Sequence, residues 1–170
     1  IMIGEIRDQD TMNCAIQFGE TAHPCVATLH DNSANQALDR IINFFPEDRR
    51  QQLLMDLSLN LKAIVSLRLI PREGSKGRVP AVELLLTSPY ISDLILKGEV
   101  HEIKEQMKKS RALGIQTFDQ ALIDLFERHE ISQEDALRYA DSKGEVQLAT
   151  RLQTERGQKG DPTVTAKGGD

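Results

Sequence analysis

The first 45 residues alternate short apolar runs with amphipathic segments, and this order restricts the fold more than any other feature of the chain. Residues 1–3 read as the end of a buried strand, and 4–10 as the polar loop beyond it. Apolar residues recur at helical spacing over 10–19, so we predict a helix there. The apolar run 24–29 predicts a second strand, and 34–42 carries the apolar stripe of a second helix. Strands that alternate with helices predict an α/β fold with a largely parallel sheet.

The rest of the chain predicts one long helix, a β-hairpin and a run of shorter helices. The long helix is expected over 46–66, and turn residues separate two hairpin strands at 67–71 and 79–86. The later helices are predicted at 89–96, 99–112, 117–128 and 132–140. We therefore expect three parts, with bounds at 1–87, 88–141 and 142–170. The last of these is a tail, and its Gly, Lys, Asp and Thr content predicts disorder at least from 157.

Charge and cysteine content exclude several classes of protein. The formal net charge of -5 leaves no basic excess to neutralise phosphates, so we expect no nucleic-acid partner. The two cysteines, Cys14 and Cys25, form no C-x-x-C pair, so neither a disulfide framework nor a metal cluster is expected. No stretch approaches the ~20 apolar residues of a membrane helix, and no signal peptide opens the chain. Reduced thiols in a cytoplasmic protein fit this composition.

Glu5 is the first candidate for chemistry, because it directly follows the apolar run 1–3. Open α/β sheets bind ligands at the carboxyl ends of their strands, where this side chain is expected. In phosphate-transfer enzymes, an acid in this place holds Mg²⁺ or orients the attacking water. The alternative is a solvated loop acid. Arg7, Asp8 and Asp10 surround Glu5 in the sequence, which favours a site without excluding the alternative.

His23 and His30 flank the predicted strand 24–29 and form the second candidate feature. Seven strand steps of ~3.3 Å place the two residues ~23 Å apart, too far to share one metal ion with Cys25. His30 is expected at the same edge of the sheet as Glu5, where a sensor of a nucleotide's terminal phosphate belongs. The alternative is a histidine that donates to a loop carbonyl, which the spacing alone slightly favours.

Three segments in this order resemble the secretion-ATPase superfamily. They are Gly4-Glu-Ile-Arg-Asp-Gln-Asp-Thr11, Gly19-Glu-Thr-Ala-His-Pro-Cys-Val-Ala-Thr-Leu-His30 and Ser33-Ala-Asn-Gln-Ala-Leu-Asp-Arg40. The pattern is most similar to the PilT/PilU family of type IV pilus retraction ATPases, and the run 41–60 is similar to the PilU branch in particular. The likeness extends through Asp141 and covers the C-terminal half of such a protein.

The resemblance implies both a fold and a set of site residues. The fold is α/β: 1–87 is expected to be the C-terminal part of a RecA-like P-loop ATPase domain including a β-hairpin, followed by a C-terminal helical bundle over 88–141. Glu5 falls on the family's Walker B glutamate, so the resemblance implies a catalytic acid with Mg²⁺ held nearby through the nucleotide. The histidine box implies nucleotide sensing by His30 and His23. Supporting roles are expected for Arg7, Asp8 and Thr28.

The sequence departs from the family pattern at several positions. Ala22 stands where a glycine is usual and Pro24 where an aliphatic residue is usual, so the resemblance carries over to His30 more directly than to His23. The segment 88–97 occupies the place of a PilT helix but lacks its two arginines, which favours a PilU-like accessory motor. Pilus-assembly and type II secretion relatives carry a four-cysteine zinc segment in this half, and this sequence does not.

The family's phosphate-binding loop is expected upstream of residue 1. The glycines at 74 and 77 do not fit G-x-x-x-x-G-K-[ST] and are assigned to the hairpin turn. The resemblance therefore implies that the chain does not hydrolyse ATP alone, and that the full-length protein uses ATP and Mg²⁺. It also implies a cytoplasmic homohexamer that works with a PilT-like motor, peripheral at the inner-membrane pilus base. The alternative is a non-catalytic interaction or oligomerisation module that docks on a pilus motor ring, which the charged helices over 99–140 support.

Overall fold

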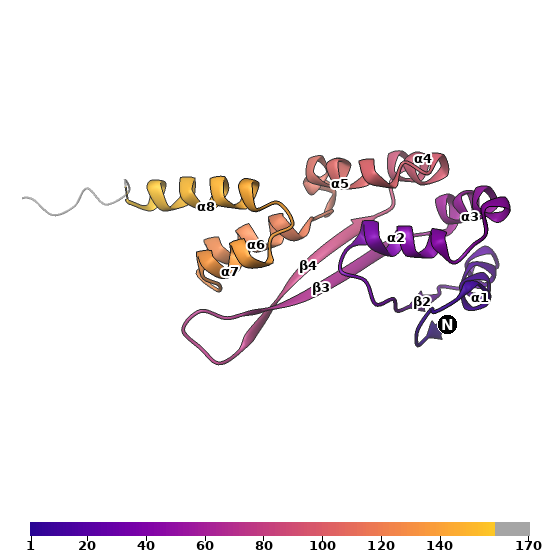
Figure 1. Cartoon of the computed structure of the whole chain (residues 1–170), viewed down its shortest axis with the longest axis horizontal. Coiled ribbons are helices and arrows are strands. Elements are labelled where there is room, and N and C mark those ends of the chain that lie inside the picture. The colour runs from indigo at the N-terminus through magenta and orange to yellow at the C-terminus, as the bar shows by residue number, and fades with distance from the viewer. Residues whose placement is uncertain (159–170) are drawn as a thin grey trace, which may run out of the picture. The chain divides into compact units, whose positions relative to one another are not determined.

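The computed structural model describes residues 1–158, which divide into two compact units (Figure 1). The first unit comprises Ile1–Arg68 and Val82–Thr117, and the second comprises Leu69–Ala81 and the chain from Phe118 onward. These bounds differ from the predicted ones at 87/88 and 141/142. Each strand of the hairpin belongs partly to one unit and partly to the other. The helices between 88 and 117 belong to the first unit, and those from 118 onward belong to the second.

The first unit begins with a short parallel pair of strands. β1 (Met2–Ile3) pairs with β2 (Val26–Ala27), with Met2 opposite Val26, and α1 (Gln9–Glu20) lies between them in the chain. β2 is shorter than the predicted strand 24–29, although the backbone pairing continues from Ile6 N–H to Thr28 O at 2.9 Å. Because the strands are parallel, both reach their carboxyl ends at the same edge.

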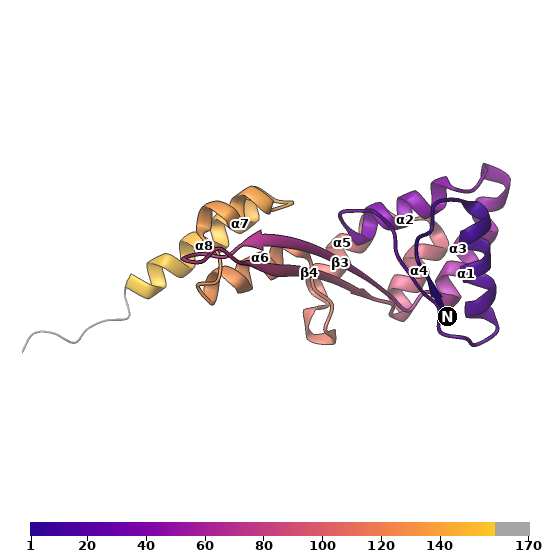
Figure 2. The same cartoon turned by 90° about the horizontal axis from the view of Figure 1, so that it is seen from below.

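Four α-helices and one 3₁₀-helix complete the first unit around an aliphatic core. They are α2 (Ala34–Asn43), α3 (Glu47–Asn60), α4 (Pro89–Lys97), α5 (Val100–Lys109) and η1 (Arg111–Leu113). α3 packs against α1, α2 and α4, while α5 packs against α2 and α4; Figure 2 shows α1 and α3 side by side. The buried side chains of this core include Leu38, Leu53, Ile91 and Ile103. Ser33 caps α2, and its hydroxyl accepts the N–H of Gln36.

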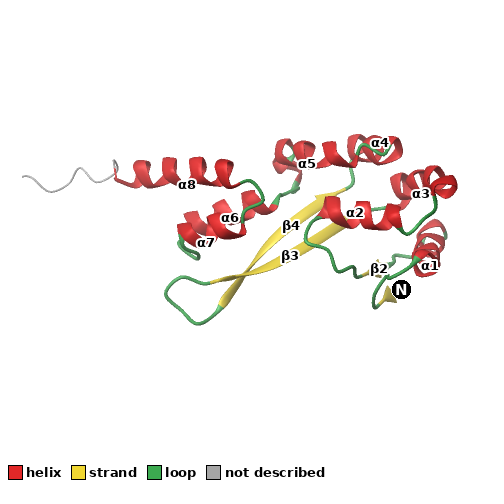
Figure 3. Ribbon diagram, in the orientation of Figure 1, coloured by secondary structure: helices red, strands yellow, loops and turns green. Residues whose placement is uncertain are grey.

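The hairpin consists of β3 (Ala63–Pro71) and β4 (Arg78–Leu86), the two long strands in Figure 3. The prediction that the preceding helix continues to 66 is wrong, because α3 ends at Asn60 and the chain extends from Leu61. The apolar residues of 61–66 fit a helical stripe, but they also fit the two-residue alternation of a strand with β-branched side chains. The strand forms because its backbone pairs with β4, and the pairing extends one residue beyond both strands in the hydrogen bond from Thr87 N–H to Lys62 O at 3.0 Å.

The second unit packs α6 (Phe118–Glu127), α7 (Gln133–Tyr139) and α8 (Lys143–Gln158) against one another. The prediction of a tail from 142 is corrected by α8, and helix replaces the predicted disorder at 157 and 158; residues 159–170 lie outside the described residues. Val146 and Thr150 are fully buried one helical turn apart, so α8 has a packed face despite its polar composition. Asp119 accepts the backbone N–H groups of Asp141 and Ser142 at 2.8 and 3.0 Å, just before α8 begins.

Candidate functional site

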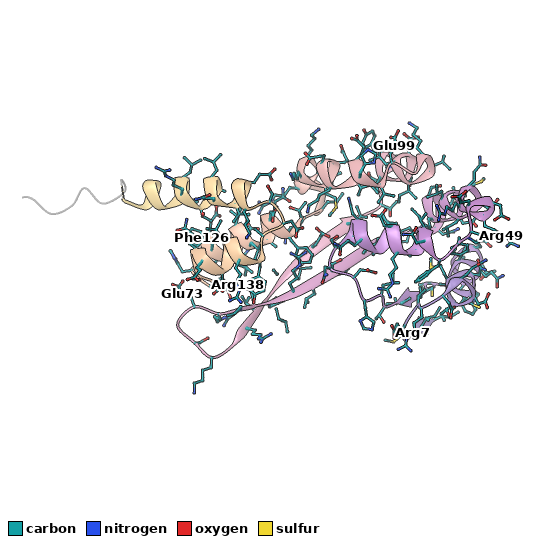
Figure 4. All side chains as sticks on the ribbon, viewed as in Figure 1. Arg7, Arg49, Glu73, Glu99, Phe126 and Arg138 are labelled. Carbon is teal, nitrogen blue, oxygen red and sulfur yellow. The ribbon has the colours of Figure 1, made fainter. Side chains whose placement is uncertain are left out.

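The side chains of Glu5, Arg7 and His30 meet at the carboxyl ends of β1 and β2. The Nε2 atom of His30 lies 3.2 Å from Oε1 of Glu5, and the guanidinium of Arg7 pairs with Oε2 of the same carboxylate. Figure 4 labels Arg7 close to the start of the chain. Each oxygen of Glu5 therefore has its own cationic or imidazole partner.

The backbone around this edge explains why the three side chains converge. Ile6 is buried and donates its N–H to Thr28 O, and the hydroxyl of Thr28 donates to the carbonyl of Gly4. These contacts tie the segment after β1 to the segment after β2. Glu5 lies between Gly4 and Ile6, so it is held at the edge where His30 emerges from the neighbouring strand. Thr28 thus contacts the backbone beside Glu5.

The charges of this cluster favour an ionised Glu5. The hydrogen bond from Arg7 lowers the pKa of Glu5; partial desolvation opposes it, and the charges of Arg7 and His30 add to the lowering. The same pairing raises the pKa of Arg7. The side chain of Glu5 is 21% exposed, whereas those of Arg7 and His30 are 75% and 74% exposed. A partly covered carboxylate flanked by two accessible nitrogen groups is suited to contact a polar ligand from solvent.

Asp8 occupies the N-cap position of α1. Its Oδ1 accepts both the N–H and the hydroxyl of Thr11 at 2.8 Å, and the backbone hydrogen bond is the main cause that lowers the pKa of Asp8. The contacts of Asp8 thus begin the helix that follows the site. Asp8 thus fixes the end of the loop that carries Glu5 and Arg7.

His23 lies in the turn that follows α1, before β2. The ring atom Nδ1 of His23 lies 3.1 Å from the hydroxyl of Thr21, and the backbone N–H of His23 donates to Phe18 O at 3.0 Å. Ala22, where the resemblance leads us to expect a glycine, adopts a left-handed φ of 60°. His23 precedes β2 and His30 follows it, so the two histidines lie at opposite ends of this strand. Because β2 runs parallel to β1, the end with His30 is the one beside Glu5. The structure therefore brings His30, but not His23, to Glu5.

The loop that carries His30 is held by charged residues that the sequence analysis did not select. Arg40 on α2 donates to His30 O at 2.9 Å, and Arg68 on β3 donates to Asn32 O at 3.0 Å. Glu83 on β4 accepts the N–H of Ala34 at 2.7 Å. A signal for Glu83 was present: it is the charged member of an alternating series whose other inward positions are 79, 81 and 85, all apolar.

Two properties of the described part of the chain concern metal binding and membrane-spanning helices. Among those residues, no group of three or more His, Cys, Asp and Glu side chains is arranged to hold a metal ion. The helices described there also lack the length and apolar content of a membrane span. Glu5 can supply one carboxylate toward Mg²⁺, which proteins commonly bind through one or two carboxylates plus the phosphates of a substrate.

Comparison with known proteins identifies the family of the chain. The model of the family described as "Type II/IV secretion system protein" matches residues 1–162. The chain belongs to this family, and within it to the PilT/PilU pilus ATPases, as the sequence motifs predict.

Individual relatives show how far the similarity reaches. The chain is 56% identical over 155 residues to the type IV pilus ATPase PilU of Pseudomonas aeruginosa, a match covering 91% of this chain and 41% of the relative. It is 35% identical over 136 residues to PilT of the same organism, covering 80% and 39%. The crystal structure of the pilus retraction motor PilT with bound ADP superposes with a TM-score of 0.78 at 34% identity, covering 87% of this chain and 41% of that one. The chain thus spans about two-fifths of the length of these relatives.

Proposed function

We propose that this chain is the C-terminal part of a motor ATPase that powers type IV pilus retraction, and that Glu5 is its catalytic acid. The observation that carries the proposal is the contact between Glu5 and His30 at the carboxyl edge of two parallel strands. An ionised carboxylate at such an edge can orient a water molecule for attack on a terminal phosphate. The similarity to PilU and to an ADP-bound PilT supports a nucleotide as the ligand.

Each site residue has a role that its contacts support. Glu5 orients the attacking water, and its carboxylate would help to hold Mg²⁺, which would neutralise phosphate charge when bound with the nucleotide. His30 reports on the terminal phosphate, because its imidazole contacts Glu5 while most of the ring remains accessible. Arg7 keeps Glu5 ionised, and Thr28 fixes the backbone beside it. His23 is a second nucleotide contact in the family pattern, and its contacts in this chain favour a lesser role.

The proposal includes the assembly and its place in the cell. Similarity to pilus motor ATPases supports a cytoplasmic homohexamer that acts with a PilT-like motor at the inner-membrane pilus base. We propose that the phosphate-binding loop belongs to the remaining three-fifths of the relatives' length. Hydrolysis is then a property of the longer protein.

The decisive experiment measures ATP hydrolysis by a version of this protein extended to the length of its relatives. Glu5→Gln keeps the size of the side chain and removes its charge, so turnover should fall by roughly 10²- to 10⁴-fold. Glu99→Gln is the matched control, since Glu99 is an exposed acid that precedes α5 (Figure 4). Near-normal turnover in Glu5→Gln, or an equal loss in Glu99→Gln, contradicts the assigned role.

A second candidate function is an interaction module that docks on a motor ring without hydrolysing ATP. It is favoured by aliphatic side chains on the strands of the first unit that stay exposed, namely Val26, Val65 and Leu67. Binding of labelled ATP to the 170-residue chain alone distinguishes the incomplete ATPase from the interaction module. Micromolar binding contradicts the claim that the site is incomplete, whereas association with longer subunits in the absence of ATP binding supports the module.

A further inference from the structure

The loop between β2 and α2 is tied down along its length. Arg40 reaches the carbonyl of His30, and Arg68 reaches the carbonyl of Asn32. The N–H of Asn32 donates to Gln36 Oε1 at 3.2 Å. This loop carries the imidazole that contacts Glu5, so whatever sets the path of its backbone also sets the distance between those two side chains.

Glu83 makes a buried hydrogen bond at the end of this loop, where α2 begins. Its side chain lies on β4 and the residue is only 2% exposed. Its Oε1 accepts the N–H of Ala34, which is the first residue of α2 and is itself fully buried. The first N–H groups of a helix have no partner within the helix, and a carboxyl group at that end also interacts favourably with the helix dipole.

We propose that Glu83 is a positioning residue for His30: from β4 it holds the start of α2, and through Ala34 it fixes the loop that places the imidazole against Glu5. Ser33 already accepts the N–H of Gln36, and Glu83 accepts the N–H of Ala34, a residue with no exposed surface. Without Glu83, the start of α2 must shift to bring Ala34 to another acceptor, because an unpaired buried N–H is costly. The shift carries the residues between His30 and Ser33 with it.

The length of the Glu83 side chain, rather than its charge, is the testable quantity. Glu83→Gln keeps an oxygen at the same reach, whereas Glu83→Asp keeps the acid and shortens the reach by one methylene. In the 170-residue chain, nuclear Overhauser contacts between the His30 ring and the Glu5 side chain should persist in Glu83→Gln and be lost in Glu83→Asp. Exchange of the Ala34 amide should accelerate by roughly tenfold or more in Glu83→Asp alone.

Asp119 provides a matched control in the second unit. It is also a buried carboxyl that accepts backbone N–H groups at the start of a helix. Asp119→Asn and Asp119→Glu should disturb α8 and leave the contact between His30 and Glu5 intact. Equal effects from Asp119 variants, or a preserved contact in Glu83→Asp, overturn the assignment of Glu83.

The catalytic consequence rests on the proposed function, whereas the positioning does not. In the extended protein, Glu83→Asp should lower kcat roughly 10- to 100-fold with little change in the KM for ATP. In a His30→Ala background the same change should have little further effect, since Glu83 acts through His30. Fully additive losses contradict the positioning role. An extended protein that hydrolyses no ATP contradicts the proposed function, and the amide exchange of Ala34 then still decides the role of Glu83.

Discussion

The Nε2 atom of His30 lies 3.2 Å from Oε1 of Glu5, so the residues that follow two parallel strands share one contact. The other oxygen of Glu5 is engaged by Arg7. Glu5 is therefore the centre of the cluster, and the position of its carboxylate depends on both Arg7 and His30. Arg7 contributes a guanidinium, and His30 contributes an imidazole.

Replacing Arg7 by Gln should raise the pKa of Glu5 toward its ordinary value, because the hydrogen bond from Arg7 is the largest cause of the lowering. Carboxyl ¹³C shifts of Glu5 followed through an acid titration measure this directly. Arg49→Gln is the control, since Arg49 is an exposed arginine on α3 (Figure 4). An unchanged Glu5 titration in Arg7→Gln would falsify this account of the cluster.

The sign of the pH dependence follows from the same direction of shift. Glu5 has a lower pKa in the folded chain, so its pairing contributes stability that is complete above the ordinary pKa of a glutamate. That contribution is lost as the pH falls through the lowered value. The thermal midpoints of the wild type and Glu5→Gln should therefore converge on acidification. A difference that grows at low pH contradicts this prediction.

Asp8 and α1 offer a test of local structure beside the site. Asp8→Ala removes the acceptor for the N–H of Thr11, so the first turn of α1 should fray and its amides should exchange faster. Asp8→Ser retains an N-cap oxygen and should preserve most of the protection. Equal protection in both variants indicates that the cap does not limit the opening of this helix.

Parts of the fold and site were predictable because they depend on local patterns. The edge shared by Glu5 and His30 follows from two apolar runs, each ending in a polar residue, and the Ser33 cap follows from residue type. The strand at 63–66 was missed because its apolar spacing fits two periods, and only pairing with β4 selects between them. The link from Glu83 to Ala34 joins segments far apart in sequence, and burial within one strand pattern was its only local sign.

The packing of α8 also could not be predicted from the local sequence pattern, and the helix offers a matched pair of variants. Val146 is fully buried among the residues of the second core, whereas Leu148 is 62% exposed on the same helix. Val146→Ala should lower the free energy of unfolding by roughly 1.5–3 kcal/mol, and Leu148→Ala should change it little. Urea denaturation followed by circular dichroism measures both. If the two variants lose equal stability, α8 does not pack through Val146.

The two histidines of the family motif should separate in their effect on activity. His30 contacts Glu5, so His30→Ala in the extended protein should lower kcat for ATP hydrolysis by one or more orders of magnitude, in the range of a lost acid–base or positioning contact. His23 contacts the turn after α1, so His23→Ala should cost less than His30→Ala. Ala22→Gly introduces the glycine that the resemblance implies beside His23 and relieves the left-handed strain there. If His23→Ala is as severe as His30→Ala, the nucleotide reaches both histidines, and the contact with Glu5 is not what distinguishes them.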